Sequence, residues 1–206
     1  MVNRRKQLTK IDIMKSLIGI FLLLASLTVG AQSSYEDSMK KFISDYVTTH
    51  EVVKGNDREH LSFFPINKYY RVDARFEAVK DSKWFNMPTS GALSKPHRVY
   101  GYLYFTINDT AVKLAVYQSQ NLLQMEKYRT FLFLPFTDLS SGEETYAVGR
   151  YIDLLTTDIV NNQVVIDFNK AYNPYCAYSE KYSCPFPPKG NVLKTAVRAG
   201  EKNYHH

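Results

Sequence analysis

Alternation of apolar and polar side chains limits the fold of this chain more than any other feature of its sequence. Between Tyr70 and Ala78 every second residue is apolar or aromatic, and the residues between them are Arg, Asp, Arg and Glu. Successive side chains of a β-strand point to opposite faces of its sheet, so a period of two predicts a strand with one buried face. A strand over residues 70–79 therefore places the chain among sheet-based folds.

Further segments rich in Val, Ile, Tyr, Phe and Thr follow, and turn-forming pairs such as Asn108-Asp109 separate them. We expect strands over residues 98–107, 111–118, 130–136, 144–155, 163–169 and 192–198. The connections are short and few windows are helical, which favours a mainly β fold with an antiparallel sheet over a parallel α/β fold. The sequence leaves open whether the sheet closes as a barrel or packs as a sandwich.

One amphipathic helix is expected before the strands. Apolar and aromatic side chains from Tyr35 to Tyr46 recur at steps of four, three and four, which predicts a helix over residues 35–48 packed on the part of the chain that follows it. Its polar face carries an S-x-x-K pattern from Ser38 to Lys41, in which a lysine activates a serine. The S-D-N and K-T-G partners of that motif are missing, so a solvated helix face is the favoured interpretation.

The N-terminus has the composition of an export signal. Residues 1–16 hold five basic side chains and one acid, and residues 17–29 hold no charge. The apolar run is shorter than the about 20 residues that span a bilayer, which favours a signal peptide over a retained anchor. We expect cleavage of residues 1–31, leaving residues 32–206 as a single β-rich domain in the periplasm or outside the cell. Translation from Met14 would yield the same mature protein.

Cleavage would also change the charge of the chain. The signal carries five of the 26 basic and one of the 20 acidic residues, so the mature chain has a net charge of +2. Nucleic-acid binding needs a dense basic face, and this composition argues against it. No integral membrane segment would remain after cleavage, and the sequence does not indicate an oligomeric state.

Signatures of common cofactor and metal sites are missing. The chain has no G-x-G-x-x-G, P-loop, H-E-x-x-H or G-x-S-x-G motif, and the histidines at 50, 60, 97, 205 and 206 lack metal-ligand spacing. We therefore expect no cofactor and no bound metal. These absences lower the expectation of an enzyme without excluding one.

The expected strand over residues 144–155 mixes charged and apolar side chains on one face. Glu144, Tyr146 and Arg150 fall on the same face as Ile152, so the strand either twists at Gly149 or lines a polar cavity. In a cavity, the planar guanidinium of Arg150 would hold a ligand carboxylate or phosphate. The alternative is a structural ion pair of that arginine with Asp153, Glu144 or Asp138.

Polar side chains also gather where the strand over residues 163–169 ends. Asp167 and Asn169 close this strand, and Asn173 follows shortly after it. An acid and two amides at one strand end would orient a ligand or a catalytic water. The alternative is that these side chains satisfy backbone amides in Asx-turns.

The two cysteines, Cys176 and Cys184, lie in a proline-rich loop from Tyr172 to Pro188. Export to an oxidising compartment makes a disulfide the default expectation. Closing this short ring would stabilise the irregular loop by about 2 to 3 kcal/mol. Inert thiols are the next alternative, followed by a thiolate nucleophile or a share of a metal site, for which no histidine partner is close in sequence.

Long stretches of the chain resemble one family. The segments Ile166 to Asn191, Val197 to Lys202 and Phe133 to Leu154, together with LSFFPINKYYRV, are similar to the bacterial domain of unknown function 1684 family. The resemblance covers nearly the whole mature chain and implies no activity and no cofactor. The residues that it marks as candidates are Asp138, Glu144, Tyr146, Arg150, Tyr151, Asp167, Asn169, Asn173, Cys176, Tyr178, Cys184, Asn191 and Glu201.

These observations lead to three functional hypotheses. The first is an exported β-domain that binds a small polar ligand or glycan in a pocket. The second is a hydrolase in which Asp167 or Glu144 is the general base and Arg150 stabilises charge. The third is a structural envelope protein. The residues expected to bind the ligand are Glu144, Tyr146, Arg150, Asp167, Asn169, Asn173 and Tyr178.

Overall fold

A computed structural model describes residues 34–92 and 94–204. The expected signal peptide and the two terminal histidines lie outside these residues. Residues 34–49 are helical, and the chain from residue 42 onward forms one compact unit that contains the whole sheet. Within the described residues, no helix combines the length and the apolar character that crossing a membrane requires.

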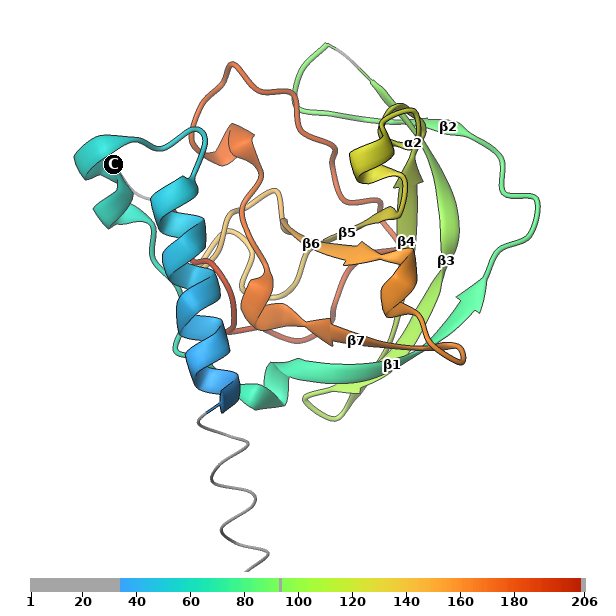
Figure 1. Ribbon diagram of the computed structural model, residues 1–206, viewed down its shortest axis with the longest axis horizontal. Helices are drawn as coiled ribbons and strands as arrows, with labels where there is room; N and C mark the ends of the chain where they lie inside the picture. The colour runs from blue at the N-terminus through green and yellow to red at the C-terminus, as the bar shows by residue number, and fades with distance from the viewer. Residues whose placement is uncertain (1–33, 93, 205–206) are drawn as a thin grey trace, which may run out of the picture. The chain divides into compact units, whose positions relative to one another are not determined.

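The sheet has seven strands, and every pairing between them is antiparallel (Figure 1). Their order is β6-β5-β4-β3-β1-β7, and β2 pairs with β3 beside this path. The prediction of a mainly antiparallel β protein is confirmed. The strands are β1(Arg71–Ala78), β2(Phe85–Met87), β3(Lys95–Ile107), β4(Thr110–Ser119), β5(Phe131–Phe136), β6(Arg150–Leu155) and β7(Gln163–Asp167).

This single sheet curls into a half-barrel, so of the two forms that the sequence left open, the sandwich of two sheets is not formed (Figure 1). Its two ends approach each other, because Tyr151 in β6 exchanges two backbone hydrogen bonds with Tyr172, which follows β7. The register between β3 and β4 shifts between Val99 and Gly101, and such a bulge increases the bend of a strand. At Gly101 the ring of Phe76 lies where a Cβ atom would be, so only glycine fits.

Short helical turns connect the strands. Among the described residues after residue 49, the α-helical turn is α2(Gln120–Leu123), and the other helical turns are 3-10 turns. The β3–β4 hairpin turns at Asn108 and Asp109, which both have positive φ angles, of 47° and 56°, as a two-residue hairpin requires. The 3-10 turns are η1(Gly55–His60), η2(Lys68–Tyr70), η3(Glu126–Tyr128), η4(Thr156–Asp158), η5(Phe168–Lys170) and η6(Tyr175–Ala177).

The main hydrophobic core fills the concave side of the sheet with side chains from β1, β3, β4, β5, β6 and β7. Phe168 is fully buried at its centre, with ring centroids 5.3 Å from Phe136 and 5.9 Å from Phe105. A second cluster around Tyr117, Phe133 and Tyr151 lies on the other side of the same strands. The two clusters follow from the period of two, because alternate residues of β5 and β6 enter different clusters.

Two expected strands are wrong in whole or in part. Residues 144–149 form turns, and the strand begins only at Arg150. Gly149 has φ +107°, and a Cβ there would lie 2.5 Å from the carbonyl oxygen of Phe136, so the chain turns at this glycine. Residues 192–198 make one isolated bridge, between Val192 and Thr137, and the side chains of Asp138 and Arg150 bind the backbone N–H and carbonyl of Val197.

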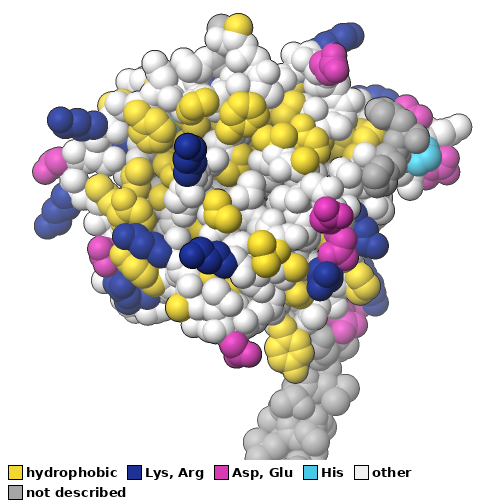
Figure 2. Space-filling view, turned by 180° about the vertical axis from the view of Figure 1, so that it is seen from behind, with side chains coloured by type: hydrophobic (Ala, Val, Ile, Leu, Met, Phe, Trp, Pro, Cys, Tyr) yellow, Lys and Arg dark blue, Asp and Glu magenta, His cyan; other side chains and the backbone are white. Residues whose placement is uncertain are grey.

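Basic side chains do not gather on the face that Figure 2 shows. Lysine and arginine side chains stand apart from one another on this face, with hydrophobic side chains between them (Figure 2). Large hydrophobic side chains that remain exposed in the described residues include Tyr69, Leu139 and Val160. They lie far apart in sequence, Tyr69 in η2(Lys68–Tyr70) and the other two in segments between elements.

Candidate functional site

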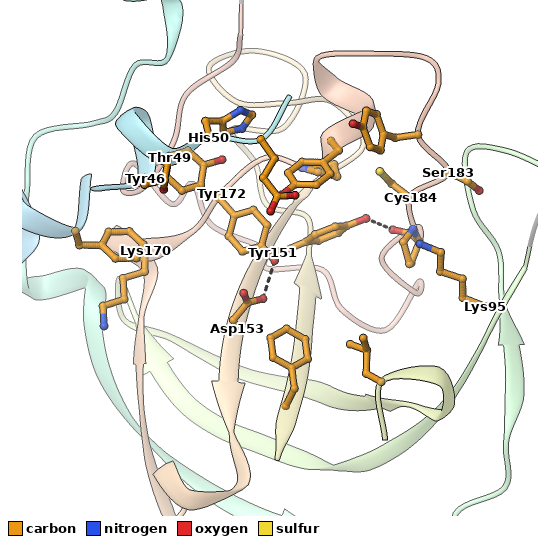
Figure 3. Close-up of a pocket in the computed structure, with 18 residues that line it drawn as sticks. Tyr46, Thr49, His50, Lys95, Tyr151, Asp153, Lys170, Tyr172, Ser183 and Cys184 are labelled. Carbon is orange, nitrogen blue, oxygen red and sulfur yellow. Dashed lines mark hydrogen bonds between the residues drawn. The ribbon is translucent and has the colours of Figure 1, made fainter. Parts of the chain in front are cut away.

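The candidate site is a cavity of about 670 Å³ whose wall residues lie between Phe42 and Pro185 (Figure 3). Its walls come from the helical residues 42–49, from β5 and β6, and from two segments of the C-terminal third, 170–175 and 182–185. Tyrosine is the commonest residue among them. The aromatic side chains of the walls are Phe42, Tyr46, Phe131, Tyr151, Tyr172, Tyr175 and Tyr182.

The central rings of the cavity are fixed by packing and by hydrogen bonds. Tyr151 and Tyr172 face each other edge-on, with centroids 5.9 Å apart and planes at 90°, because their backbones pair across the two ends of the sheet. The Tyr151 hydroxyl donates to the carbonyl oxygen of Pro185. Its ring also packs edge-on against Phe133 at 4.6 Å. Rings held in this way present a preformed surface to a ligand.

Asp153 places a carboxylate in the cavity beside these rings (Figure 3). It comes two residues after Tyr151 in β6, so both side chains point to the same face of the sheet. The hydroxyl of Tyr172 donates to Oδ1 of this carboxylate at 2.6 Å. The carboxylate is open to the solvent of the cavity, but protein atoms surround it, and this desolvation raises its pKa to about 6.

Two lysines lie on opposite sides of the cavity, Lys170 on the side of the N-terminal helix and Lys95 beside Cys184 (Figure 3). The ammonium group of Lys170 lies 5.6 Å from the ring centroid of Phe42. Among the described residues, neither lysine has a carboxylate within ion-pair distance. The cavity therefore combines one carboxylate of raised pKa with two ammonium groups that remain available to a ligand.

His50 is a buried wall residue whose ring has one unused nitrogen. Its Nδ1 accepts the backbone N–H of Val53 at 2.9 Å, which leaves the ring proton on Nε2. This Nε2 has no hydrogen-bond partner among the described residues. Burial is the main cause that lowers the pKa of the ring, and nearby Lys54 and Arg58 lower it further. His50 is therefore neutral at pH 7 and packs edge-on against Tyr178, with centroids 4.7 Å apart.

The residues expected from the sequence to bind the ligand do not line this cavity. Arg150 is completely buried, and its guanidinium donates to Asp138 Oδ2 at 2.9 Å and to the carbonyl oxygens of Val197 and Glu201 at 2.8 and 3.2 Å. A further bond joins it to the carbonyl of Ala199. Arg150 therefore forms a structural ion pair with Asp138, the alternative to a ligand-binding role. Its bonds also connect the C-terminal segment to β6.

Of the ion-pair partners considered for Arg150, the period of the strand excludes Asp153. Residues 150 and 153 are an odd number of positions apart in β6, so their side chains point to opposite faces. Asp153 therefore lies in the cavity, and Arg150 lies on the side of the core. The sequence already contained this signal, because the face of β6 that carries Tyr151 also carries Asp153.

Asp167 and Asn169 form an Asx-turn, which was the alternative to a ligand site in the sequence analysis. Asp167 Oδ1 accepts the backbone N–H of Asn169 at 3.1 Å and its side-chain amide at 3.0 Å. The Asn169 side chain also bonds both backbone groups of Asn67, each at 2.9 Å. These bonds join the start of the domain to the end of β7, away from the cavity.

Asn173 and Tyr178 belong to a buried cluster around Glu201. The Tyr178 hydroxyl donates to Glu201 Oε1 at 2.6 Å, and the Tyr46 hydroxyl and the Asn173 backbone N–H donate to Oε2 at 3.0 and 2.8 Å. Burial of Glu201 is the largest effect and raises its pKa to about 7, although these donors act against it. Because Tyr46 also lines the cavity, this cluster supports one of its walls.

Glu144 and Tyr146 have different surroundings. Glu144 is exposed and accepts Arg198 Nε with both carboxylate oxygens, at 2.7 and 3.0 Å. It lines a second, smaller depression of about 220 Å³ together with Phe64 and Lys202. The Tyr146 hydroxyl donates to Cys176 Sγ at 3.9 Å. The structure thus distributes the seven expected residues over five places.

The two cysteines are neighbours and are not bonded to each other in the structure. The backbone N–H of Cys176 donates to Cys184 Sγ at 3.1 Å, and Cys184 is also a wall residue of the cavity. The expected disulfide is therefore not present here, and the pairing remains a prediction. Among the described residues, no three His, Cys, Asp or Glu side chains are arranged to hold a metal ion.

Comparison with known proteins gives a structural relative and a family. The solution NMR structure of an uncharacterized protein from gene locus rrnAC0354 of Haloarcula marismortui is similar, with 27% identity and a TM-score of 0.64. The alignment covers 84% of this chain and 96% of that one. No curated protein matches this chain. Residues 57–202 match the family described as protein of unknown function (DUF1684), and the chain belongs to that family.

Proposed function

We propose that this protein binds a small polar ligand, of the glycan type, in the aromatic cavity. The observation that carries the proposal is the combination of size and lining. A volume of about 670 Å³ falls within the ~300–1,000 Å³ of typical small-molecule sites. Seven aromatic side chains surround few charged groups, as in sites where apolar walls supply contact area and a few polar groups orient the ligand.

The polar groups of the cavity suit hydroxyl-rich ligands. A sugar ring has an apolar C–H face that packs on an aromatic ring, and its hydroxyls donate to carboxylates and accept from ammonium groups. Tyr151 and Tyr172 offer such rings, and Asp153 lies beside them. Lys95 and Lys170 at the sides would also accept an acidic sugar (Figure 3).

Thermal unfolding of the purified protein in the presence of neutral, acidic and amino sugars tests the proposal. A ligand that binds only the folded state raises the melting temperature in proportion to the logarithm of its concentration. An Asp153→Asn variant should weaken binding by roughly 10-fold or more, because a hydrogen bond to a charged group contributes about 1.5–3 kcal/mol. Glu144→Gln is the matched control, since Glu144 lies outside the cavity and is exposed.

Two results would refute a ligand site in this cavity. One is a folded protein whose melting temperature no sugar changes. The other is a ligand whose affinity falls equally in the Asp153→Asn and Glu144→Gln variants, since only the first change is made in the cavity.

A hydrolase is the second candidate, and the raised pKa of Asp153 favours it. A general acid or base works best when its pKa is near the working pH, and that of Asp153 is about 6. Asp167 and Glu144, the bases expected from the sequence, lie outside the cavity, as does Arg150, so Asp153 replaces the two acids as the candidate base. If a bound sugar derivative is cleaved, Asp153→Asn should abolish turnover while the folded protein still binds the substrate. Unchanged turnover would exclude this role.

We also propose that the protein is exported and works in the periplasm or outside the cell. The support is the basic and then uncharged composition of residues 1–31. The mass of the protein recovered from cell fractions tests this directly. A chain beginning at Gln32 in the envelope or medium supports export, and an intact N-terminus in the cytoplasm contradicts it.

A further inference from the structure

Cys176 and Cys184 are placed for chemistry that neither the cavity nor the family accounts for. Cys176 lies in η6 and its side chain is half-buried, whereas Cys184 is buried at the edge of the cavity. The backbone N–H of Cys176 donates to Cys184 Sγ at 3.1 Å, and the two thiols lie close enough for each to shift the pKa of the other. Two thiols in contact, one of them accessible, form the arrangement that thiol–disulfide exchange requires.

The hydrogen bonds around the pair are asymmetric. The Cys184 thiol is the main donor to Cys176 Sγ, and the hydroxyls of Ser90 and Tyr146 also stabilise the Cys176 thiolate. These donors lower the pKa of Cys176 to about 6. The same bond to Cys176 raises the pKa of Cys184, because Cys184 holds the shared proton. These contacts thus favour the thiolate of Cys176 and the protonated thiol of Cys184.

We infer that Cys176 and Cys184 form a redox-active dithiol that reduces low-molecular-weight disulfides, with Cys176 as the nucleophile and Cys184 as the resolving thiol. The Cys176 thiolate attacks one sulfur of the small disulfide, forms a mixed disulfide and releases one small thiolate. Cys184 then gives its proton to that thiolate, which leaves as a thiol, and attacks Cys176 Sγ. This step closes the protein disulfide and releases the second half of the small disulfide as a thiolate, which takes a proton from water. Two protein thiols are oxidised and one disulfide is reduced to two thiols.

Formation of the mixed disulfide on Cys176 promotes the attack by Cys184 that follows it. The hydrogen bond to Cys176 is the largest cause that raises the pKa of Cys184, burial is the second, and the charge on Cys176 adds to both. Formation of the mixed disulfide removes that charge, so Cys184 becomes easier to deprotonate when its attack is needed. Because Cys184 lines the cavity, the reaction also changes one of its walls. The inference does not depend on a ligand in the cavity.

The test is the reaction of the fully reduced, folded protein with glutathione disulfide at pH 5. A thiol of pKa about 6 is then roughly 300-fold more ionised than an ordinary cysteine of pKa ~8.5, while its thiolate is ~10–20-fold less nucleophilic. We therefore expect Cys176 to react about 15- to 30-fold faster than the cysteine of an unstructured peptide. The wild-type protein should release two glutathione molecules per chain and end with a Cys176–Cys184 disulfide, detected by alkylation and peptide mass analysis.

Variants separate the two roles. Cys184→Ser keeps a hydroxyl donor beside Cys176 but removes the resolving thiol, so the protein should accumulate glutathione on Cys176. Cys176→Ser should react no faster than the peptide. Tyr146→Phe removes one donor to Cys176 Sγ and should slow the reaction at pH 5 several-fold. Circular dichroism confirms that each variant is folded.

Three outcomes would overturn the inference. The first is a wild-type rate equal to that of the peptide, and the second is equal reactivity of the Cys176→Ser and Cys184→Ser variants. The third is a Cys176–Cys184 disulfide that an excess of reduced glutathione cannot open in the folded protein, which would identify a static structural bond. None of these outcomes affects the sugar-binding proposal, so the two can fail separately.

Discussion

Replacing Asp138 with asparagine should be among the most damaging single polar changes in this protein. Asp138 and Arg150 form an ion pair at 2.9 Å in which both side chains are 0% exposed. Asp138→Asn keeps the volume and the Oδ1 acceptor, to which Ser140 and Val197 donate their backbone N–H groups. It removes the negative charge, however, and leaves the guanidinium of Arg150 buried without compensation.

The magnitude follows from the environment of this arginine. Removing one partner of a buried ion pair typically costs about 3–5 kcal/mol, because the remaining charge cannot regain its hydration. The carbonyl oxygens of Val197, Ala199 and Glu201 still accept from Arg150, so we expect the lower half of this range. Equilibrium unfolding in urea measures the difference in free energy of unfolding.

The matched control is Glu144→Gln, which breaks the Arg198–Glu144 pair at 2.7 Å, where the side chains are 59% and 40% exposed. An exposed pair contributes about 0–1 kcal/mol. A double variant, Asp138→Asn with Arg150→Met, should cost clearly less than the sum of its single variants, because it removes the charge that the first change leaves unpaired. If Asp138→Asn costs no more than the control, Arg150 is not held by this carboxylate in solution and the reasoning is refuted.

The remaining predictions concern pH, backbone strain and the cavity. Glu201 has its pKa raised from 4.5 to about 7, so the folded state binds more protons than the unfolded state, and its contribution to stability is lost as the pH rises from about 4.5 through 7. Comparing wild type with Glu201→Gln in urea at several pH values should show this loss, and parallel curves would contradict it. Gly149→Ala should destabilise the fold by about 1–3 kcal/mol or more, because φ is +107° and a Cβ would lie 2.5 Å from a backbone oxygen. Gly142→Ala should destabilise the fold less, because the atom nearest to the added Cβ would lie at 3.8 Å. Thermal unfolding measures both variants, and an equal loss of stability would show that the backbone angle φ alone determines the cost. Ligand binding that depends on the Asp153 carboxylate should weaken as the pH falls through about 6, as calorimetric titration can measure; an unchanged affinity at pH 5 would exclude a charged partner.

The sequence predicted strands best where one period applied over a whole element. The strands expected over residues 70–79, 98–107, 111–118, 130–136 and 163–169 are present as β1, β3, β4, β5 and β7, with small shifts at their ends. Each of them has at least one face in a hydrophobic cluster, and burial of one face imposes the alternation.

Strand prediction failed where hydrogen bonds to distant side chains replace the backbone hydrogen bonds between neighbouring strands. Residues 192–198 have strand-like composition, but Asp138 and Arg150 bind the backbone of Val197, so no neighbouring strand is needed there. The missed strand β2(Phe85–Met87) is three residues long, too short for a period to be recognised.

The residues of the candidate site were likewise predicted from the sequence only in part. Residues marked by the family resemblance, such as Asp138, Arg150 and Glu201, lie in buried polar clusters that hold the C-terminal segment. Of that set, Tyr151 and Cys184 line the cavity. The remaining cavity residues come from segments far apart in the chain, such as Tyr46, Asp153 and Lys170.

The sequence by itself determined the class of fold and the presence of polar groups that cannot all be exposed. Periodicity is a local property, so it can be read from one segment at a time. The tertiary structure decided that Arg150 pairs with Asp138, that Asp153 enters a cavity, and that the two cysteines touch. These facts depend on how far the sheet curls and on which ends of the chain meet, through the pairing of Tyr151 with Tyr172. Such long-range contacts leave no local pattern in the sequence.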